Sequence, residues 1–242
     1  MKRKCEKHGD YEATTLGSVG GKDRYSTCPK CYEEMENKLV AISKEQERGK
    51  YLHTLNSAGI PLRYHGSSLD GFKADGDENK QKALQACKLF TGKMEEFLSK
   101  GVSIILCGKP GTGKTHLGCA MLLEAMKMGY KGAYVGIFDL FDHYKSTFSS
   151  NAEETGRDVV DRYRRPDLLV IDEVGVQYGS EAEAVIIFRI LNERYNNLRS
   201  TIIISNFLAQ DLSKYLGSSV VDRLMDNNGA IVPFNWASYR RG

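Results

Sequence analysis

The chain has 242 residues, of which 41% are apolar and 27% charged, and a formal net charge of +3. This length holds one domain of ordinary size with a small appendage, and the composition is that of a soluble globular protein. No apolar run approaches the roughly 18 residues that span a bilayer, and no apolar segment follows the basic N-terminus as in a secretory signal. We therefore expect a cytoplasmic protein with no membrane partner, in which the 6 cysteines are thiols or metal ligands rather than disulfides.

The N-terminal segment contains two closely spaced pairs of metal-ligand side chains, Cys5-x2-His8 and Cys28-x2-Cys31. Four such ligands in two pairs are typical of a tetrahedral zinc site. Because the segment has few large apolar residues, a bound metal ion would supply its folding free energy. The alternative is that the four residues are incidental. The remaining cysteines fall within apolar patterns and are expected to be core thiols: Cys87, Cys107 and Cys119.

A long helix is predicted next. Residues 32–58 lack proline and are heavily charged, which favours an exposed helix, and Gly59 and Pro61 end it. A turn-rich connector follows around residue 70. We place the domain boundary there, with residues 1–70 as an N-terminal module and helical linker and residues 71–242 as a second domain.

The second domain alternates helices with short apolar strands. One helix carries an apolar face of Leu84, Cys87, Met94 and Phe97/Leu98, and a second, residues 114–128, turns Leu117, Met121, Ala125 and Met128 inward. A third is marked by Val185, Phe188, Leu191, Tyr195 and Leu198. The predicted strands are residues 102–107, 132–137, 167–172 and 201–205. Continuously apolar strands separated by helices predict an α/β fold, a parallel sheet covered by helices on both faces.

The first strand leads into a phosphate-binding loop of the pattern Gly-x4-Gly-Lys-Thr. The residues expected to bind the nucleotide are Gly108, Lys109, Pro110, Gly111, Thr112, Gly113, Lys114, Thr115 and His116. Glycines let backbone N–H groups face the phosphates, Lys114 reaches the β and γ phosphates, and the Thr115 hydroxyl is a ligand for Mg²⁺. A glycine-rich turn with a surface lysine is the alternative, but it does not explain the strand before the loop and the helix after it.

Polar side chains end two further strands. Asp172 and Glu173 follow an apolar strand, which places both carboxylates at the carboxyl edge of the sheet. We expect Asp172 to hold Mg²⁺ and Glu173 to act as general base toward the attacking water. Asn206 ends the next strand and would hold that water or sense the γ phosphate, unless it only starts a turn. No LSGGQ-like signature lies between the two motifs, which disfavours a transporter ATPase, and the series resembles the AAA+ class of P-loop ATPases.

Three segments together resemble the DnaC-type replicative helicase loaders. They are "GKPGTGKTHL", "DLLVIDEVGVQ" and the closing "VVDRLMDNNG…VPFNWASYR", and the resemblance extends over residues 55–241. IstB-type transposition ATPases share the same core. The resemblance implies an AAA+ sheet without a C-terminal helical lid, ATP hydrolysis, and ATP-dependent self-assembly into an oligomer or spiral.

The resemblance also implies a role for two arginines. Arg223 would project into the ATP site of a neighbouring subunit, where a cation stabilises charge on the transferring phosphoryl group. The alternative is a surface ion pair of Arg223 with Asp222 or Asp226. Relatives often carry a second arginine one helical turn earlier, and here Ser219 stands at that position. Arg240 is a candidate sensor of the nucleotide in its own subunit.

Loaders of this type hold single-stranded DNA, and two segments here interleave aromatic and basic residues as a stacking surface would. They comprise Tyr144, Lys145 and Phe148, then Tyr163, Arg164 and Arg165. Gln177 and Tyr178 follow the second strand motif, where the family lines its DNA channel. Burial of the aromatic rings in the core is an equal alternative.

The sequence thus predicts an ATP-dependent loader that delivers a hexameric replicative helicase onto single-stranded DNA. The zinc module would dock the helicase or bind DNA. One alternative is an IstB-like helper of DNA transposition. Another is a non-catalytic adaptor that binds zinc and nucleotide, although the complete set of Lys114, Asp172, Glu173 and Asn206 argues against it.

Overall fold

The computed structural model describes residues 1–20, 22–175 and 181–241. Its contacts divide the chain into two compact units, Met1–Thr54 and Leu55–Gly242. This division falls earlier than the boundary at residue 70 that the sequence suggests. The reason is packing, because Leu55, Ala58 and Ile60 are all buried in the core of the second unit.

The first unit consists of two small hairpins and most of a long helix. Strand β1 (Lys2–Cys5) pairs with β2 (Gly9–Glu12), and β3 (Thr15–Val19) pairs with β4 (Lys22–Tyr25), both antiparallel. Among the described residues up to Thr54, only Ala13 and Cys28 are buried. The hairpins therefore lack an apolar core of their own.

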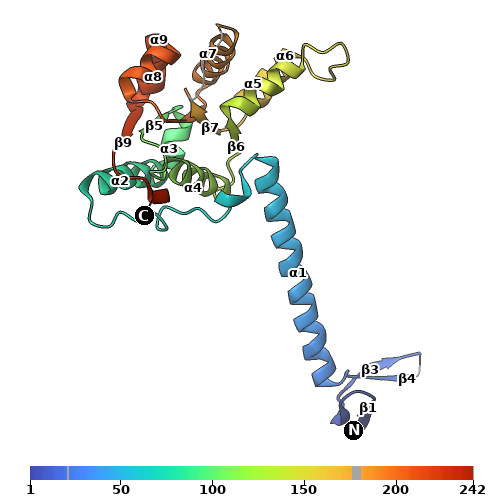
Figure 1. The fold of residues 1–242 in the computed structure, drawn as a ribbon. Coiled ribbons are helices and arrows are strands. Elements are labelled where there is room, and N and C mark those ends of the chain that lie inside the picture. Colours follow the sequence, from blue (N-terminus) through green and yellow to red (C-terminus); the bar gives the residue numbers. More distant parts are fainter. Residues whose placement is uncertain (21, 176–180, 242) are drawn as a thin grey trace. The chain divides into compact units, whose positions relative to one another are not determined.

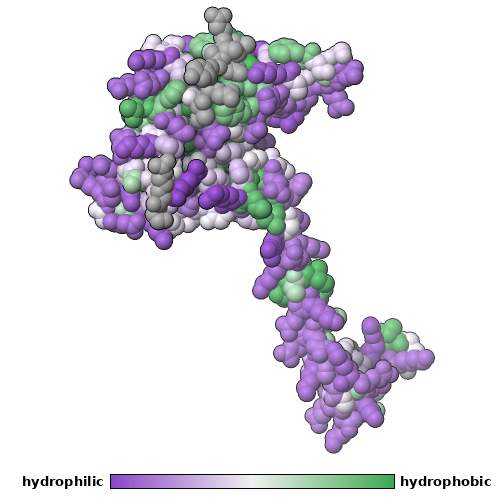
Figure 2. All heavy atoms as spheres, viewed as in Figure 1, coloured by the Kyte–Doolittle hydropathy of each residue, from purple (hydrophilic) through white to green (hydrophobic). Residues whose placement is uncertain are grey.

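Helix α1 (Pro29–Ser57) confirms the predicted long helix. Its surface is largely hydrophilic (Figure 2). The exposed apolar side chains on it include Leu39, Val40 and Ile42. The helix ends in a turn at Gly59, whose φ of +75° lies in the left-handed region that favours glycine. The Ile60 N–H donates to the carbonyl of Leu55 across this turn, at 3.2 Å.

A five-stranded parallel sheet forms the centre of the second unit (Figure 1). Its strands are β5 (Ile104–Gly108), β6 (Gly132–Gly136), β7 (Leu168–Val174), β8 (Ser200–Ser205) and β9 (Ala230–Phe234), in the order β6-β7-β8-β5-β9. All neighbouring pairs are parallel, which confirms the predicted sheet. β5 lies between β8 and β9, so the loop that follows it is flanked on both sides.

Helices cover both faces of this sheet. They are α2 (Glu78–Gly92), α3 (Met94–Ser99), α4 (Lys114–Lys127), α5 (Ile137–Ser146), α6 (Gly156–Arg164), α7 (Glu181–Asn196), α8 (Ala209–Leu216) and α9 (Ser218–Met225). Alternate strand residues face opposite sides: Ile104 and Leu106 join one core cluster, whereas Ile105 and Cys107 join the other. After β9 the described residues form only a 3₁₀ turn, Tyr239–Arg241, with no helical lid.

The first helix predicted in the second domain is in fact two helices. α2 ends at Gly92 and α3 begins at Met94, because the intervening Lys93 has a non-helical φ of −113°. Met94 and Leu98 are nevertheless buried with Cys87, as their apolar pattern suggests. The three remaining predicted core thiols are confirmed, since Cys87, Cys107 and Cys119 are each at most 1% exposed. Burial raises the pKa of Cys87 to about 12.

Two predicted apolar faces are partly wrong. Met128 is 55% exposed, because α4 ends at Lys127 and Met128 only caps it. On α7, the buried face consists of Ile186, Ile187, Ile190 and Leu191 rather than the predicted set. Of that set only Leu191 is buried; the other members are exposed: Val185, Phe188, Tyr195 and Leu198.

Candidate nucleotide-binding site

The phosphate-binding loop joins β5 to α4 and is closely packed on both sides. Gly108 has a φ of +127°, and a Cβ there would lie 2.5 Å from the carbonyl oxygen of Phe234 on β9. Gly113 has a φ of +94° at the start of α4, and a Cβ would lie 2.8 Å from the Phe72 ring. At these two positions only glycine fits both the backbone angle and the space.

Lys114 is the first residue of α4 and is only 5% exposed. Its ammonium donates to the carbonyl oxygens of Gly108, at 2.8 Å, and Lys109, at 2.7 Å. Burial lowers the pKa of Lys114 to about 8, while the nearby Asp172 carboxylate acts in the opposite direction. The side chain thus folds back into the loop where the sequence predicts a phosphate contact.

Asp172 and Thr115 lie together, although 57 positions separate them in the chain. The Thr115 hydroxyl donates to Oδ2 of Asp172 at 2.8 Å, and the backbone N–H of Glu173 donates to Oδ1 at 2.7 Å. Asp172 is 4% exposed at the end of β7. A hydroxyl and a carboxylate are oxygen donors of the kind that Mg²⁺ prefers, so this pair fits the ion.

Glu173 and Asn206 lie at the same edge of the sheet, and both side chains are exposed. Glu173 has a φ of +62°, rare for a residue with a side chain, and falls where the pairing of β7 with β8 shifts between Ile171 and Val174. The irregular backbone turns Glu173 out of the strand's alternation while Asp172 stays buried. Such geometry is characteristic of functional positions.

A cavity of about 390 Å³ lies over the loop, a size suited to a small ligand. Its lining includes the following residues singled out from the sequence: Pro110, Gly111, Gly113, Lys114, Thr115, His116, Asp172, Glu173, Asn206 and Arg240. The other three loop residues do not line the cavity and contribute to the backbone of the loop: Gly108, Lys109 and Thr112. Sequence reasoning missed a further set of lining residues: Arg63, Tyr64, Gly71, Phe72, Lys73, Ile204 and Tyr239. Three of these, Gly71, Phe72 and Lys73, lie in the turn-rich connector, and Arg63 and Tyr64 lie in the 3₁₀ turn Leu62–Tyr64 just before it. Neither segment carries a recognisable motif.

The C-terminal segment is tied directly to the loop. The Tyr239 N–H donates to the carbonyl of Gly111 at 2.8 Å, and the Trp236 indole N–H donates to that of Thr112 at 3.1 Å. The rings of Phe72 and Tyr239 meet edge to face, with centroids 5.9 Å apart. The connector also reaches the loop through His116, whose Nε2 lies 2.9 Å from the Ser68 carbonyl oxygen. Two segments far apart in the chain therefore form one wall of the cavity.

Arg223 lies on α9, away from the cavity of its own chain. Its guanidinium lies over the rings of Phe188 and Tyr195, 5.6 and 5.9 Å from their centroids. Within the described residues it forms no ion pair with Asp222 or Asp226, and its Nη1 is buried without a hydrogen-bond partner. Asp226 instead accepts a hydrogen bond from the Tyr195 hydroxyl, at 2.9 Å.

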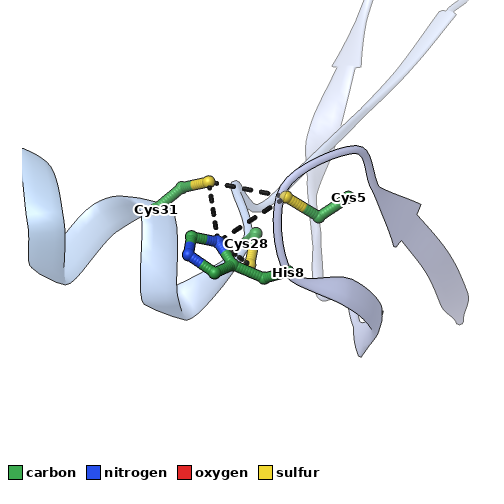
Figure 3. A group of neighbouring side chains, drawn as sticks. All are labelled: Cys5, His8, Cys28 and Cys31. Atoms are coloured by element: carbon green, nitrogen blue, oxygen red, sulfur yellow. Dashed lines mark hydrogen bonds between the residues drawn. The ribbon is translucent and has the colours of Figure 1, made fainter.

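The four N-terminal candidate metal ligands, Cys5, His8, Cys28 and Cys31, converge in the first unit (Figure 3). Nδ1 of His8 lies 3.3 Å from Sγ of Cys31 and 3.8 Å from Sγ of both Cys5 and Cys28. Ligands of a tetrahedral zinc ion lie about 3.3 to 3.8 Å apart at ordinary metal–ligand distances, so the spacing fits. Nε2 of His8 faces Glu34 at 3.1 Å, the second contact that commonly orients a metal-binding histidine.

The candidate DNA-binding residues occupy mixed environments. Tyr144 and Tyr163 pack partly against the core, whereas the Phe148 ring is 73% exposed. Arg164 and Arg165 both form ion pairs with Asp161. Gln177 and Tyr178 lie outside the described residues. Among the described residues, no helix is long and apolar enough to span a bilayer.

Comparison with known proteins places the chain among ATP-binding proteins. A family model described as IstB-like ATP binding protein matches residues 32–242. The chain is 35% identical over 201 residues to the replicative helicase loader DnaC of Buchnera aphidicola subsp. Acyrthosiphon pisum (strain APS). That match covers 83% of this chain and 80% of the relative.

Solved structures agree. A crystal structure of the DnaC helicase loader superposes with a TM-score of 0.63 and 26% identity, covering 72% of this chain and 99% of that one. The replication initiator DnaA bound to AMPPCP and single-stranded DNA gives 0.59 and 25%, covering 74% and 51%. The chain therefore has the AAA+ fold and belongs to the IstB-like ATP-binding proteins, in the family of the DnaC-type replicative helicase loaders.

Proposed function

We propose that this chain hydrolyses ATP and uses its nucleotide state to deliver a hexameric replicative helicase onto single-stranded DNA. The observation that carries the proposal is the assembly of Lys114, Thr115, Asp172, Glu173 and Asn206 around one cavity, in a chain of the DnaC family. A structural nucleotide site would need the loop but not the exposed carboxylate and amide beside it. This argues against a non-catalytic adaptor.

Each residue has a distinct role in the proposed hydrolysis. Lys114 and the loop amides bind the phosphates, and Thr115 and Asp172 hold Mg²⁺, which neutralises phosphate charge. Glu173 orients the attacking water and accepts its proton. Asn206 holds the same water or contacts the γ phosphate. Arg240 lies in the lining and would sense the nucleotide within its own subunit.

Arg223 completes the site of a neighbouring subunit in this proposal. Three observations support it: Arg223 does not line its own cavity, it has no carboxylate partner in the described chain, and one of its nitrogens is unpaired. A cation supplied by the neighbour would make hydrolysis depend on assembly into an oligomer or spiral.

The cluster of Cys5, His8, Cys28 and Cys31 is proposed to hold a structural zinc ion. The described residues of the first unit bury only Ala13 and Cys28, which supports this, because metal binding would then supply the folding free energy. Backbone N–H groups of Lys7 and His8 lower the pKa of Cys5 to about 6, whereas the contact with Cys5 raises the pKa of Cys31 to about 11, so the two neighbouring thiols share one proton when no metal ion is bound. The module would serve to dock the helicase, with DNA binding as the alternative.

A transposition helper is the second candidate, favoured by the IstB-like family model over residues 32–242. The two differ in their protein partner. We expect the tagged chain, recovered from replicating cells with Glu173→Gln to stabilise its ATP-bound form, to bring a hexameric helicase with it. Recovery of a transposase without a helicase would support the transposition helper instead. Lys114→Ala is the matched control.

Lys114 and Glu173 have separate roles in the proposed site, so their variants should fail in different ways. Lys114→Ala should abolish nucleotide binding, measured by titration with a fluorescent ATP analogue. Glu173→Gln should preserve binding but lower turnover by about 100-fold or more, because an amide cannot accept the proton. Hydrolysis by Glu173→Gln at the wild-type rate would show that another group is the base.

Metal analysis tests the N-terminal module. We expect one zinc ion per chain after purification under reducing conditions, and loss of that ion in Cys28→Ser but not in the control Cys87→Ala. Chelation should raise hydrogen exchange only in residues 1 to about 35. Protein that contains no zinc and takes none up would leave the four side chains without this role.

Mixing two inactive variants tests Arg223. Arg223→Ala should keep nucleotide affinity but lose most turnover, because Lys114 and the loop amides remain. Combined with Glu173→Gln chains, it should regain part of the activity, since some interfaces then pair an intact Arg223 with an intact Glu173. A mixture that co-assembles, as shown by light scattering, yet stays inactive contradicts action across the interface.

A further inference from the structure

The carboxylate of Asp172 has a third donor that belongs to neither sequence motif. The hydroxyl of Tyr134, on β6, donates to Oδ2 at 2.8 Å, the same oxygen that accepts from Thr115. A phenol is protonated at neutral pH, so the Tyr134 hydroxyl is the donor of this bond and the carboxylate is the acceptor.

The three donors to Asp172 belong to different parts of the fold. Thr115 belongs to the phosphate-binding loop and is itself a ligand for the ion, and the Glu173 N–H belongs to the irregular end of β7. Tyr134 lies on a separate strand that pairs with β7, with Tyr134 beside Val170. Its hydroxyl is thus a contact with Asp172 that comes from outside both the phosphate-binding loop and the end of β7.

The backbone of Tyr134 is fixed from the other side by the turn that ends α1. The Tyr134 N–H donates to the carbonyl of Ala58 at 2.7 Å, and a Cβ on Gly59 would lie 2.5 Å from the Tyr134 carbonyl oxygen. β6 is an edge strand, so this turn pairs with a backbone that would otherwise be open. The turn itself is anchored by the buried side chains of Leu55 and Ile60.

We propose that Tyr134 is a positioning residue for the magnesium-binding carboxylate, and that the turn at residues 58–59 sets its place. The hydroxyl fixes the rotation of the Asp172 carboxylate before magnesium and nucleotide arrive. A single residue thereby joins the end of α1 to the nucleotide site. The inference rests on the proposed function, in which Asp172 holds Mg²⁺ beside ATP.

Tyr134→Phe tests whether the hydroxyl positions the Asp172 carboxylate, because it removes the hydroxyl and keeps the ring. In EDTA, the affinity for a fluorescent ATP analogue should stay within about twofold of the wild type. The gain in affinity on adding Mg²⁺ should fall by about tenfold, since a hydrogen bond to a charged group is lost. Tyr130→Phe is the matched control: Tyr130 packs against the same core and does not line the cavity, so its gain should be unchanged.

The outcomes separate the inference from the proposed function. If wild-type protein shows no gain with Mg²⁺, the magnesium site itself is wrong. If the wild type shows the gain and Tyr134→Phe retains it in full, only the positioning role fails. A merely structural role would weaken binding equally with and without Mg²⁺ and would also contradict the proposal.

Hydrogen exchange tests whether the turn at residues 58–59 is linked to the carboxylate, without altering the turn. The amide of Tyr134 reports its bond to Ala58. We expect the analogue with Mg²⁺ to slow its exchange more than the analogue in EDTA, and Tyr134→Phe to remove most of that difference. Equal protection of this amide in wild type with and without Mg²⁺ would show that the turn is not linked to the carboxylate.

Discussion

The buried carboxylate of Asp172 is the interaction on which the site depends. An isolated buried charge is costly, and here it is offset by donors from three places: the loop hydroxyl of Thr115, the backbone of Glu173 and the phenol of Tyr134. These groups come from α4, β7 and β6, so the carboxylate joins three elements at the carboxyl edge of the sheet. A parallel sheet makes this possible because all its strands end at that edge.

A second constraint is the close packing of the phosphate-binding loop against the rest of the second unit. The Phe234 carbonyl accepts a hydrogen bond from the Lys109 N–H, and the Trp236 indole N–H donates to the Thr112 carbonyl. The Phe72 ring lies against Gly113. One wall of the cavity is thus built from the connector and the C-terminal segment. Arg223 lies outside that wall on two aromatic rings, which is consistent with a group that acts on another subunit.

The sequence predicts the fold wherever one local pattern has one structural solution. The apolar runs of β5, β7 and β8 and the glycine loop are of this kind, and so is the convergence of Cys5, His8, Cys28 and Cys31. The buried face of α7 is not, because the buried Ile186 and Ile190, four residues apart, and the exposed Val185 and Phe188, three residues apart, both have spacings that fit one face of a helix. Tyr134 and Phe72 could not be assigned either. Their roles arise from pairing and packing across distant segments, for which a single sequence gives no signal.

Loading of the helicase on closed circular single-stranded DNA tests whether this chain delivers a helicase onto DNA. The helicase that co-purifies with the chain would be incubated with the circle and ATP, and the ring-bound fraction counted after a high-salt wash. If the chain is a helicase loader, we expect strong retention with the wild-type chain and only background retention with Lys114→Ala or without the chain. Equal retention of the helicase in all three reactions would show that the chain does not load it.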